Sequence, residues 1–385
     1  MKKLTILIVF AILSDMCFGQ MNMHLFDDDD STSIDCSYSS LDLGANNCGI
    51  SFGNSPVWNG IRFNFSDCGI KEINGINVTL WKPERNPGSI IRGIALGPAP
   101  FAGTLQGLSL GIVASTAEDK IQGLNIGGLA VVSGGDAQGI NLSGVAVVAQ
   151  NNISGISVGG IAVVSQGNLK GINIAGLASV SQGDQYGFNF GGLATVSQGE
   201  LKGLNFGGLA VVNQNDMLGI NIGGLAAVTQ GEMKGINFGG LATVTQGNLT
   251  GINIGGLAVV TQGDMRGFNL GGLAIVSQGE IYGLNVALAG IVSQSTIRGI
   301  NYCGYKTEAD EFHGLNFTAG WTDINVLKGL SISTYNKIKD TQNGLVIGLF
   351  NVAENLNGIQ LGLINIAKNN KGILKVLPVI NAHFE

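Results

Sequence analysis

The chain has 385 residues, of which 45% are hydrophobic and only 12% are charged, against about 25% charged residues in an average soluble protein. The formal net charge is −6, and no basic patch alternates with aromatic residues, which argues against a nucleic acid partner. After residue 20, no apolar run approaches the roughly 20 residues of a membrane-spanning helix. High hydrophobicity in short alternating pieces instead indicates a β membrane protein or a strongly apolar β-repeat protein.

Residues 1–19 have the pattern of a bacterial secretory signal peptide. Lys2 and Lys3 are followed by the apolar stretch Leu4–Leu13, and Gly19 suits cleavage by signal peptidase. Removing this segment takes away two lysines and one aspartate, which leaves 18 basic and 25 acidic residues and a net charge of −7. We therefore expect an exported protein, located in the outer membrane or at the cell surface.

Residues 20–57 form an acidic, polar segment without a strong period. The run Asp27–Asp30 lacks the glycine and the distal glutamate of an EF-hand calcium loop, so we interpret it as a solvated acidic tail.

Four cysteines follow the signal peptide: Cys36, Cys48, Cys68 and Cys303. An exported protein can form disulfides, and Cys36 and Cys48 are close enough in sequence to close a small loop. Four cysteines allow three pairings, and the sequence does not choose among them. The chain has no CxxC motif and only three scattered histidines, so we expect no metal site.

Residues 58–106 contain an imperfect pattern of glycine, apolar, any, apolar, as in Asn59–Phe65 and Asn74–Trp81. Prolines interrupt this region, whereas the regular repeats that follow contain none. Proline cannot donate a hydrogen bond to a strand ladder, so this distribution predicts irregular lead-in strands with longer loops.

Residues 107–299 are organised by thirteen glycines spaced sixteen residues apart, from Gly107 to Gly299, without an insertion. A typical unit is Gly251–Arg266, with the sequence GINIGGLAVVTQGDMR. Apolar residues alternate with others at period two, and valine, isoleucine and threonine are frequent, which predicts β-strands. Nearly all charges lie in the short turn after the glutamine.

Residues 300–385 begin with irregular units and then change to a fourteen-residue period at Gly344, Gly358 and Gly372. The segment Val376–Phe384 alternates again and is predicted to be a closing strand.

One architecture that fits the repeats is an up-and-down outer-membrane β-barrel. Twelve residues at ~3.3 Å each, tilted by ~40–45°, span about 28–30 Å, which is close to the ~25 Å apolar band of such barrels. The isoleucines of each unit would face lipid and the asparagine would face the lumen. Leu257 and its equivalents are unexpected in a watery lumen, and the aromatic content of 6% is low for the usual girdles.

The alternative is a parallel β-solenoid in which each unit is one coil, bent at Gly255-Gly256. Insertion-free spacing favours this architecture, because each coil must match its neighbour. An antiparallel barrel would show a period of two units, and none is evident. Identical residues would then stack as a structural asparagine ladder: Asn173, Asn189, Asn205, Asn221, Asn237, Asn253, Asn269 and Asn285.

The charge-free strand bodies decide between the two architectures. A soluble solenoid should avoid an outer surface that carries apolar side chains and almost no charge. We therefore predict an all-β fold of tandem sixteen-residue and then fourteen-residue strand repeats, forming the barrel, with the parallel β-solenoid as the alternative.

The unit GINIGGLAVVTQG, the variant NGIQLGLINIAKNN and the closing LPVINAHF resemble a family of bacterial surface-repeat proteins. These are exported proteins of spirochaetes and Bacteroidetes built from tandem units of this kind. The resemblance covers roughly Gly60 to the end of the chain. It implies a location at the surface or in the outer membrane, and it brings no activity and no catalytic residue.

No residue pattern predicts chemistry. The recurring GxxxGG lacks the context of a phosphate-binding loop, and no histidine and aspartate pair accompanies a candidate serine nucleophile. We expect no enzyme, no catalytic residue and no cofactor.

The predicted function is a structural or pore-like outer-membrane protein in contact with lipid. The alternative is a soluble β-solenoid binding module or adhesin that recognises glycan or protein. A row of turn carboxylates would be a solvated rim rather than a cation site: Asp184, Glu200, Asp216, Glu232, Asp264 and Glu280.

Overall fold

The structure is a computed structural model that describes residue 36 and residues 38–384. The chain divides into two units, Met1–Ser37 and Tyr38–Glu385. The first unit is described only at Cys36, so the signal peptide and the run Asp27–Asp30 lie outside the described residues. The second unit contains every strand found among the described residues.

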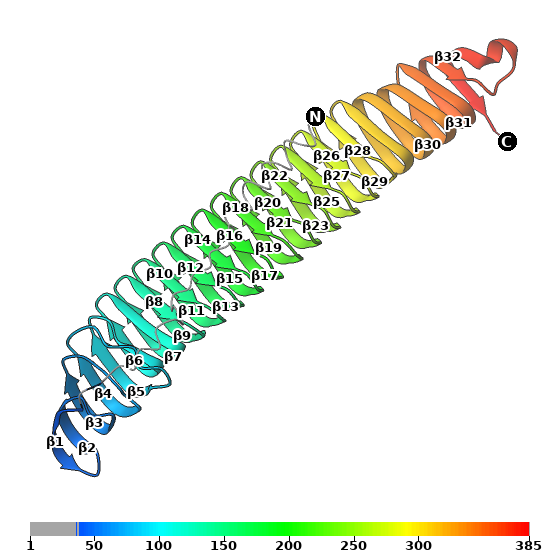
Figure 1. The fold of residues 1–385 in the computed structure, drawn as a ribbon. Helices are drawn as coiled ribbons and strands as arrows, with labels where there is room; N and C mark the ends of the chain where they lie inside the picture. Colours follow the sequence, from blue (N-terminus) through cyan, green and yellow to red (C-terminus); the bar gives the residue numbers. More distant parts are fainter. Residues whose placement is uncertain (1–35, 37, 385) are drawn as a thin grey trace. The chain divides into compact units, whose positions relative to one another are not determined.

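The second unit is a parallel β-solenoid of about 19 turns, not a barrel (Figure 1). Each sixteen-residue unit supplies two strands, and both pair in parallel with residues sixteen positions away. Asn237 lies opposite Asn253, for example, and Val244 lies opposite Val260. The predicted barrel is therefore wrong, and the parallel stacking that we gave as the alternative is the one that the chain adopts.

The lead-in coils begin with an antiparallel hairpin, after which every strand pairs in parallel with the next. These strands are β1 (Ser40–Ala45), β2 (Cys48–Gly53), β3 (Val57–Asn64), β4 (Glu72–Thr79), β5 (Ile90–Gly97), β6 (Phe101–Gly111) and β7 (Ala114–Gly127).

The regular coils alternate a long strand with a strand of four residues. The long strands are β9 (Asp136–Ser143), β11 (Ile153–Gly159), β13 (Leu169–Ala175), β15 (Gln185–Gly191), β17 (Leu201–Gly207), β19 (Met217–Gly223), β21 (Met233–Gly239), β23 (Leu249–Gly255), β25 (Met265–Gly271), β27 (Ile281–Ala287) and β29 (Thr296–Cys303). The short strands are β8 (Ala130–Ser133), β10 (Ala146–Ala149), β12 (Ala162–Ser165), β14 (Ala178–Ser181), β16 (Ala194–Ser197), β18 (Ala210–Asn213), β20 (Ala226–Thr229), β22 (Ala242–Thr245), β24 (Ala258–Thr261), β26 (Ala274–Ser277) and β28 (Gly290–Ser293).

The last coils are continuous extended runs, β30 (Lys306–Ile347) and β31 (Phe350–Ala367). The unit that begins at Gly372 does not form another coil. It forms a short 3-10 helix, η1 (Gly372–Lys375), followed by β32 (Val376–His383), which pairs antiparallel with β31 and covers the end of the stack (Figure 1). Among the described residues, no helix is long and apolar enough to cross a membrane.

Glycines hold the coil shape because no side chain fits at their positions. Gly251 has a φ of +118°, and a Cβ there would lie 2.1 Å from the carbonyl oxygen of Gly235 in the coil below. At the corner between the two strands, a Cβ on Gly255 would lie 1.9 Å from the Ala258 oxygen. Positive φ and close backbone approach both select glycine, which explains the unbroken sixteen-residue spacing.

The alternation predicted from the sequence divides each coil into an inside and an outside. Asn253, Val259 and Thr261 are buried, whereas Ile252 is 42% exposed. Leu257 follows the inward positions in sequence but is 47% exposed, because the chain turns the corner there. The turn thus places on the outside the leucine that was unexpected in a barrel lumen.

The absence of charges from the strands has a different cause from the one that we inferred. Half of the strand positions face the interior. Each outward position stacks on its equivalent in the next coil at the ~4.8 Å strand spacing, where like charges repel each other. In-register stacking therefore favours uncharged residues in the segment Gly251–Gln262 and its equivalents, and the cations that the long strands do carry outside this segment stand in every second coil. The pore-like function and the outer-membrane location inferred from the missing charges lose their basis together with the barrel.

The structure also corrects the suggested disulfide. Cys36 and Cys68 each take part in a disulfide, whereas Cys48 and Cys303 are free thiols. Cys48 opens β2 opposite Ala45 of the hairpin, and Cys68 lies in the loop between β3 and β4. Cys36 therefore does not pair with Cys48.

Candidate interaction surface

The eight predicted asparagines form one buried column along the interior of the solenoid. Each donates from Nδ2 to Oδ1 of the asparagine in the next coil, at 2.8–2.9 Å, and the column continues to Asn301. All of them are 0% exposed, so no ligand reaches them. Side-chain amide ladders of this kind stabilise in-register stacks.

The asparagine column is interrupted at Ser157. Asn141 donates to the Ser157 hydroxyl at 3.4 Å, and Oδ1 of Asn173 has no hydrogen-bond partner within the described part of the chain. At the far end, Nδ2 of Asn301 is also unpaired there. The column is thus a directed chain of amides with a defect near one end.

The predicted row of turn carboxylates binds the protein's own backbone. Oδ1 of Asp184 accepts a hydrogen bond from the Glu200 amide at 2.8 Å, and Asp216 and Asp264 accept one from the next coil in the same way. Within residues 36 and 38–384, no group of three His, Cys, Asp or Glu side chains could hold a metal ion. These side chains therefore fasten one turn to the next.

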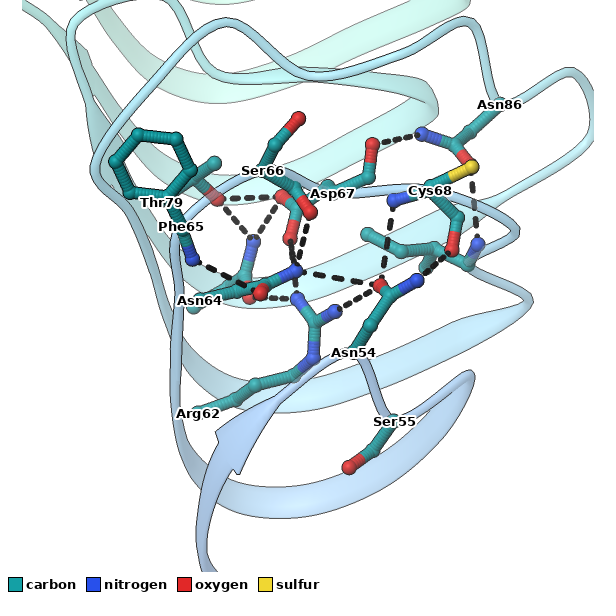
Figure 2. A network of polar contacts seen from close by, with 12 residues as sticks. Asn54, Ser55, Arg62, Asn64, Phe65, Ser66, Asp67, Cys68, Thr79 and Asn86 are labelled. Atoms are coloured by element: carbon teal, nitrogen blue, oxygen red, sulfur yellow. Dashed lines mark hydrogen bonds and ion pairs between the residues drawn. The ribbon is translucent and has the colours of Figure 1, made fainter. Parts of the chain in front are cut away.

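A buried polar cluster closes the first coils (Figure 2). Arg62 is 0% exposed and pairs with Asp67 at 2.5 Å, and it also donates to Asn77 at 2.7 Å and to Asn54 at 2.9 Å. Asp67 in turn accepts hydrogen bonds from Asn77, at 2.9 Å, and from Thr79.

The place of Arg62 in the stack shows what this cluster does. Arg62 lies opposite Asn77 and two residues after Gly60, which is the position of the buried asparagine in the regular coils. Its charge is satisfied inside the protein, since a buried ion pair needs hydrogen bonds to offset its desolvation. The cluster is therefore a polar plug at the end of the interior column, and it is closed to substrates.

The outward side of the long strands carries two columns of large apolar residues, which we call the long-strand face. The first column is Leu124, Ile140, Ile156, Ile172, Phe188, Leu204, Ile220, Ile236, Ile252, Phe268, Leu284, Ile300 and Leu315. The second is Ile126, Leu142, Val158, Ile174, Phe190, Phe206, Ile222, Phe238, Ile254, Leu270, Val286, Tyr302 and Phe317. Ten members of the first column are 37–44% exposed.

A column of cations borders the long-strand face, with one cation in every second coil: Lys170, Lys202, Lys234, Arg266 and Arg298. Tyr186, Leu218, Thr250 and Tyr282 occupy the coils between them. The spacing keeps like charges two strands apart, where their repulsion is weaker. This two-unit period is visible in the sequence at these positions, contrary to the expectation that the repeats show none.

Four of the five cations pair with turn carboxylates, and the Nζ of Lys170 instead lies 5.8 Å from the centre of the Tyr186 ring. Lys234 pairs with Glu232, and this hydrogen bond is the main reason that the pKa of Glu232 lies below its usual value. Tyr186 donates to Asp184 at 2.7 Å, which together with burial raises the pKa of Tyr186 to about 12. The Nζ of Lys202 lies 5.5 Å from the centre of the same ring. The edge of the face is thus a paired rim with little free charge.

The long-strand face ends in a groove of about 640 Å³ where the coils shorten near the C-terminus. The groove is lined by Ile332, Ile347, Leu361 and Leu363, and Val379 of β32 closes it. Val379 has a φ of +67°, which is a strained conformation for a β-branched residue and one that is often found at functional sites. An apolar recess therefore lies at one end of a long apolar surface.

The outward side of the short strands, which we call the short-strand face, is smaller and more uniform. Ala258 and Val260 point outward from β24, between the corner residue Leu257 and the turn residue Gln262. The same four columns repeat in the ten coils from Leu129 to Gln278, with Val145 and Ile161 in place of the corner leucine and Gly134 in place of one glutamine.

In comparisons with known proteins, the chain matches no family model, no curated protein and no solved structure. The resemblance found in the sequence is therefore supported as far as tandem β-strand repeats that form a solenoid.

Sequence reasoning located the asparagine column and the turn carboxylates but not the two faces or the polar plug. A signal for the plug was present, because arginine replaces asparagine in NGIRFNF when that segment is aligned with NGINVTLW.

Proposed function

We propose that this protein is an exported, non-enzymatic binding module that holds a protein partner on its long-strand face. The observation that supports the proposal is the uninterrupted double column of exposed isoleucine, leucine and phenylalanine side chains. The signal peptide supports export, and the likeness to surface-repeat proteins supports a place at the cell surface.

The size of the face favours a macromolecule. Full burial of one large apolar side chain is worth about 1.5–3 kcal/mol, or roughly 60–120 Å² at 25 cal/mol per Å². Thirteen of the twenty-six residues are 37–63% exposed and the other thirteen are less exposed. Together they present on the order of 500–1,000 Å². The largest apolar patch on an ordinary monomer is about 300–600 Å² and is often functional.

The chemistry of the face favours a protein over a glycan. The hydroxyls of a sugar need hydrogen-bond partners when they leave water. The long-strand face offers aliphatic and phenyl groups, and the polar groups at its edge are already bound to one another, as in Lys202 with Glu200. An apolar protein surface loses nothing by covering such a face, and the groove beside Val379 can receive a projecting side chain.

The test compares the exported chain, residues 20–385, with a variant that carries Ile172→Gln, Ile236→Gln and Ile252→Gln. The matched control carries Val212→Gln, Val228→Gln and Val244→Gln on the short-strand face. We expect the unchanged chain to bind one or more members of a panel of purified extracellular proteins and not insoluble chitin or cellulose. The long-strand variant should bind at least about tenfold more weakly, and the control should bind normally. Binding to the glycans alone, or protein binding that survives the long-strand changes, would show that the proposal is wrong.

A further inference from the structure

The two sides of each coil differ in which positions are allowed to vary. In the long strands the buried position two residues after the repeating glycine is almost always asparagine, although the buried position at the start of the strand varies, as in Gln185, Met233 and Leu249. The exposed positions change among isoleucine, leucine, phenylalanine and valine. In the short strands the reverse holds. The outward positions are alanine and valine in ten successive coils, from Ala130 and Val132 to Ala274 and Val276. The buried position between them changes freely: Val131, Val147, Val163, Ser179, Thr195, Val211, Ala227, Thr243, Val259 and Ile275.

Packing within the solenoid does not explain why the outward residues of the short strands are uniform while the buried residues between them vary. Close packing constrains buried side chains most strongly, and exposed ones are normally the freer. Stacking from coil to coil does not explain it either, because the long-strand face stacks in the same register with mixed residues. Uniform small residues on an exposed surface therefore indicate that another molecule packs against this surface.

We infer that the short-strand face pairs with the short-strand face of a second copy of this chain. The two solenoids would lie side by side and parallel, related by a twofold axis that runs along the stack between the alanine and valine columns. This interface is separate from the long-strand face and does not depend on the partner proposed for it.

The shape of the short-strand face is complementary to itself under this rotation. The alanine column is a groove between the ridges formed by valine and by the corner leucine. The twofold axis places the valines of one copy over the alanines of the other, at every coil. Each corner leucine then lies against the aliphatic part of a glutamine, and the glutamine amide stays at the wet edge, which is the usual arrangement of an interface core and its rim.

A second copy also matches the repeat along the stack. Adjacent coils are ~4.8 Å apart. A partner can repeat the same contact at all ten coils only if its own surface has this spacing. An identical solenoid has that spacing by construction. The face carries no charged residue in these coils, so an identical copy brings no like charges together.

The area is sufficient for a stable dimer. Nine of the ten corner residues are 45–55% exposed, and they flank the valines, which are partly exposed except for the buried Val196. On the scale used above, the corner, valine and alanine columns present on the order of 600–1,000 Å² per copy, or about 1,200–2,000 Å² for the pair. Stable interfaces bury about 1,200–2,000 Å² in total.

The test uses the exported chain, residues 20–385, in sedimentation equilibrium. We expect a dimer, and a monomer at concentrations near 100 μM would overturn the inference. The informative variant is Ala226→Leu, Ala242→Leu and Ala258→Leu, which fills the groove while making the surface more apolar. If shape holds the dimer together, this variant dissociates at least about tenfold more readily. If the dimer persists or tightens, association is general stickiness and the geometry is wrong.

Two further measurements keep the test decisive. The long-strand variant Ile172→Gln, Ile236→Gln, Ile252→Gln should remain a dimer, so that loss of partner binding and loss of pairing are separable. Should the groove-filled variant fail to fold by circular dichroism, a chain with Cys48→Ser, Ala242→Cys and Val244→Cys replaces it. Mild oxidation should link two such chains covalently, because residue 242 of one copy faces residue 244 of the other. Absence of the link would refute the arrangement.

Discussion

The long-strand half and the short-strand half of each coil are built on opposite constraints. In the long half the inside is specified by an amide ladder, and the outside varies. In the short half the inside accepts Val, Ser, Thr, Ala or Ile, and the outside is uniform. The difference teaches that a repeat can be regular for two reasons. Hydrogen bonds that must continue from coil to coil fix the interior asparagines, whereas a surface that must meet a matching surface fixes the exterior alanines and valines.

We expect the largest destabilisation of the long-strand half when the repeating glycine is replaced by a residue with a side chain. Gly235→Ala puts a Cβ 2.1 Å from the carbonyl oxygen of Gly219 at a φ of +118°. The positive φ costs about 1–2 kcal/mol and the overlap about 1–3 kcal/mol, so we expect about 2–5 kcal/mol of destabilisation. Urea unfolding would show the shift in midpoint, and hydrogen exchange would place the loss in β21 and its neighbours.

A second glycine separates backbone strain from overlap. Gly88 also has a positive φ, +70°, but nothing lies within 4 Å of the position of its Cβ. Gly88→Ala should therefore lose only about 1–2 kcal/mol. Equal losses at the two sites would mean that stacking of the glycine column contributes little.

One buried polar residue contributes more to the free energy of unfolding in the long-strand half than in the short-strand half. Asn237→Val leaves the Asn221 amide without an acceptor and the Asn253 oxygen without a donor. Each orphaned buried group costs about 1–3 kcal/mol, so we expect a loss of about 2–4 kcal/mol in urea unfolding. In the short half, Thr243→Val removes one hydrogen bond, to the Ile254 oxygen at 2.8 Å, and should cost about 1 kcal/mol. Similar losses for both variants would contradict the special role of the ladder.

The sequence was informative where a local rule applied and misleading where stacking decided the outcome. Alternation predicted that Ile252 and Val260 lie on one side of the chain and Asn253 on the other, because side chains alternate along any strand. It placed Leu257 on the wrong side, because the chain turns a corner after Gly255; the alternation resumes in the same phase at Val259. Strand direction did not follow from alternation, since the same pattern fits an antiparallel barrel and a parallel coil.

The remaining features depend on contacts between coils. The segment Gly251–Gln262 and its equivalents in the regular coils carry no charge because identical neighbours stack on them, and that is a property of the stack rather than of the segment. The Arg62 plug depends on Asp67, which reaches Arg62 from the loop that follows β3. The short-strand face became informative only when the structure showed that its uniform residues point outward.

The defect in the asparagine column gives a way to strengthen the long half. Ser157→Asn would supply an amide that accepts from Asn141 and donates to the unpaired Oδ1 of Asn173. Asparagine fits this position in the neighbouring coils, so we expect a gain of about 1 kcal/mol, measured as a higher urea midpoint. Ser157→Ala is the control and should be neutral or slightly destabilising. A destabilised Ser157→Asn protein would mean that β11 is too narrow for the amide.

The smallest effect concerns the paired rim at the edge of the long-strand face. The pKa of Glu232 lies below its usual value because Lys234, and after it Asn248, hydrogen-bond to the carboxylate. A carboxyl group whose pKa is lower in the folded state stabilises the fold above its unfolded pKa of 4.5, and that stability is lost as the pH falls through the lower, folded pKa. The urea midpoint should therefore decrease slightly between pH 5 and pH 3. The pair is largely exposed, so salt should weaken the effect. Lys234→Met should remove the part of the pH dependence that comes from this pair. An unchanged pH profile in Lys234→Met would assign the pH dependence to other rim carboxylates. As a control, Asn237→Val should lower stability at every pH and leave the slope of the urea midpoint against pH unchanged.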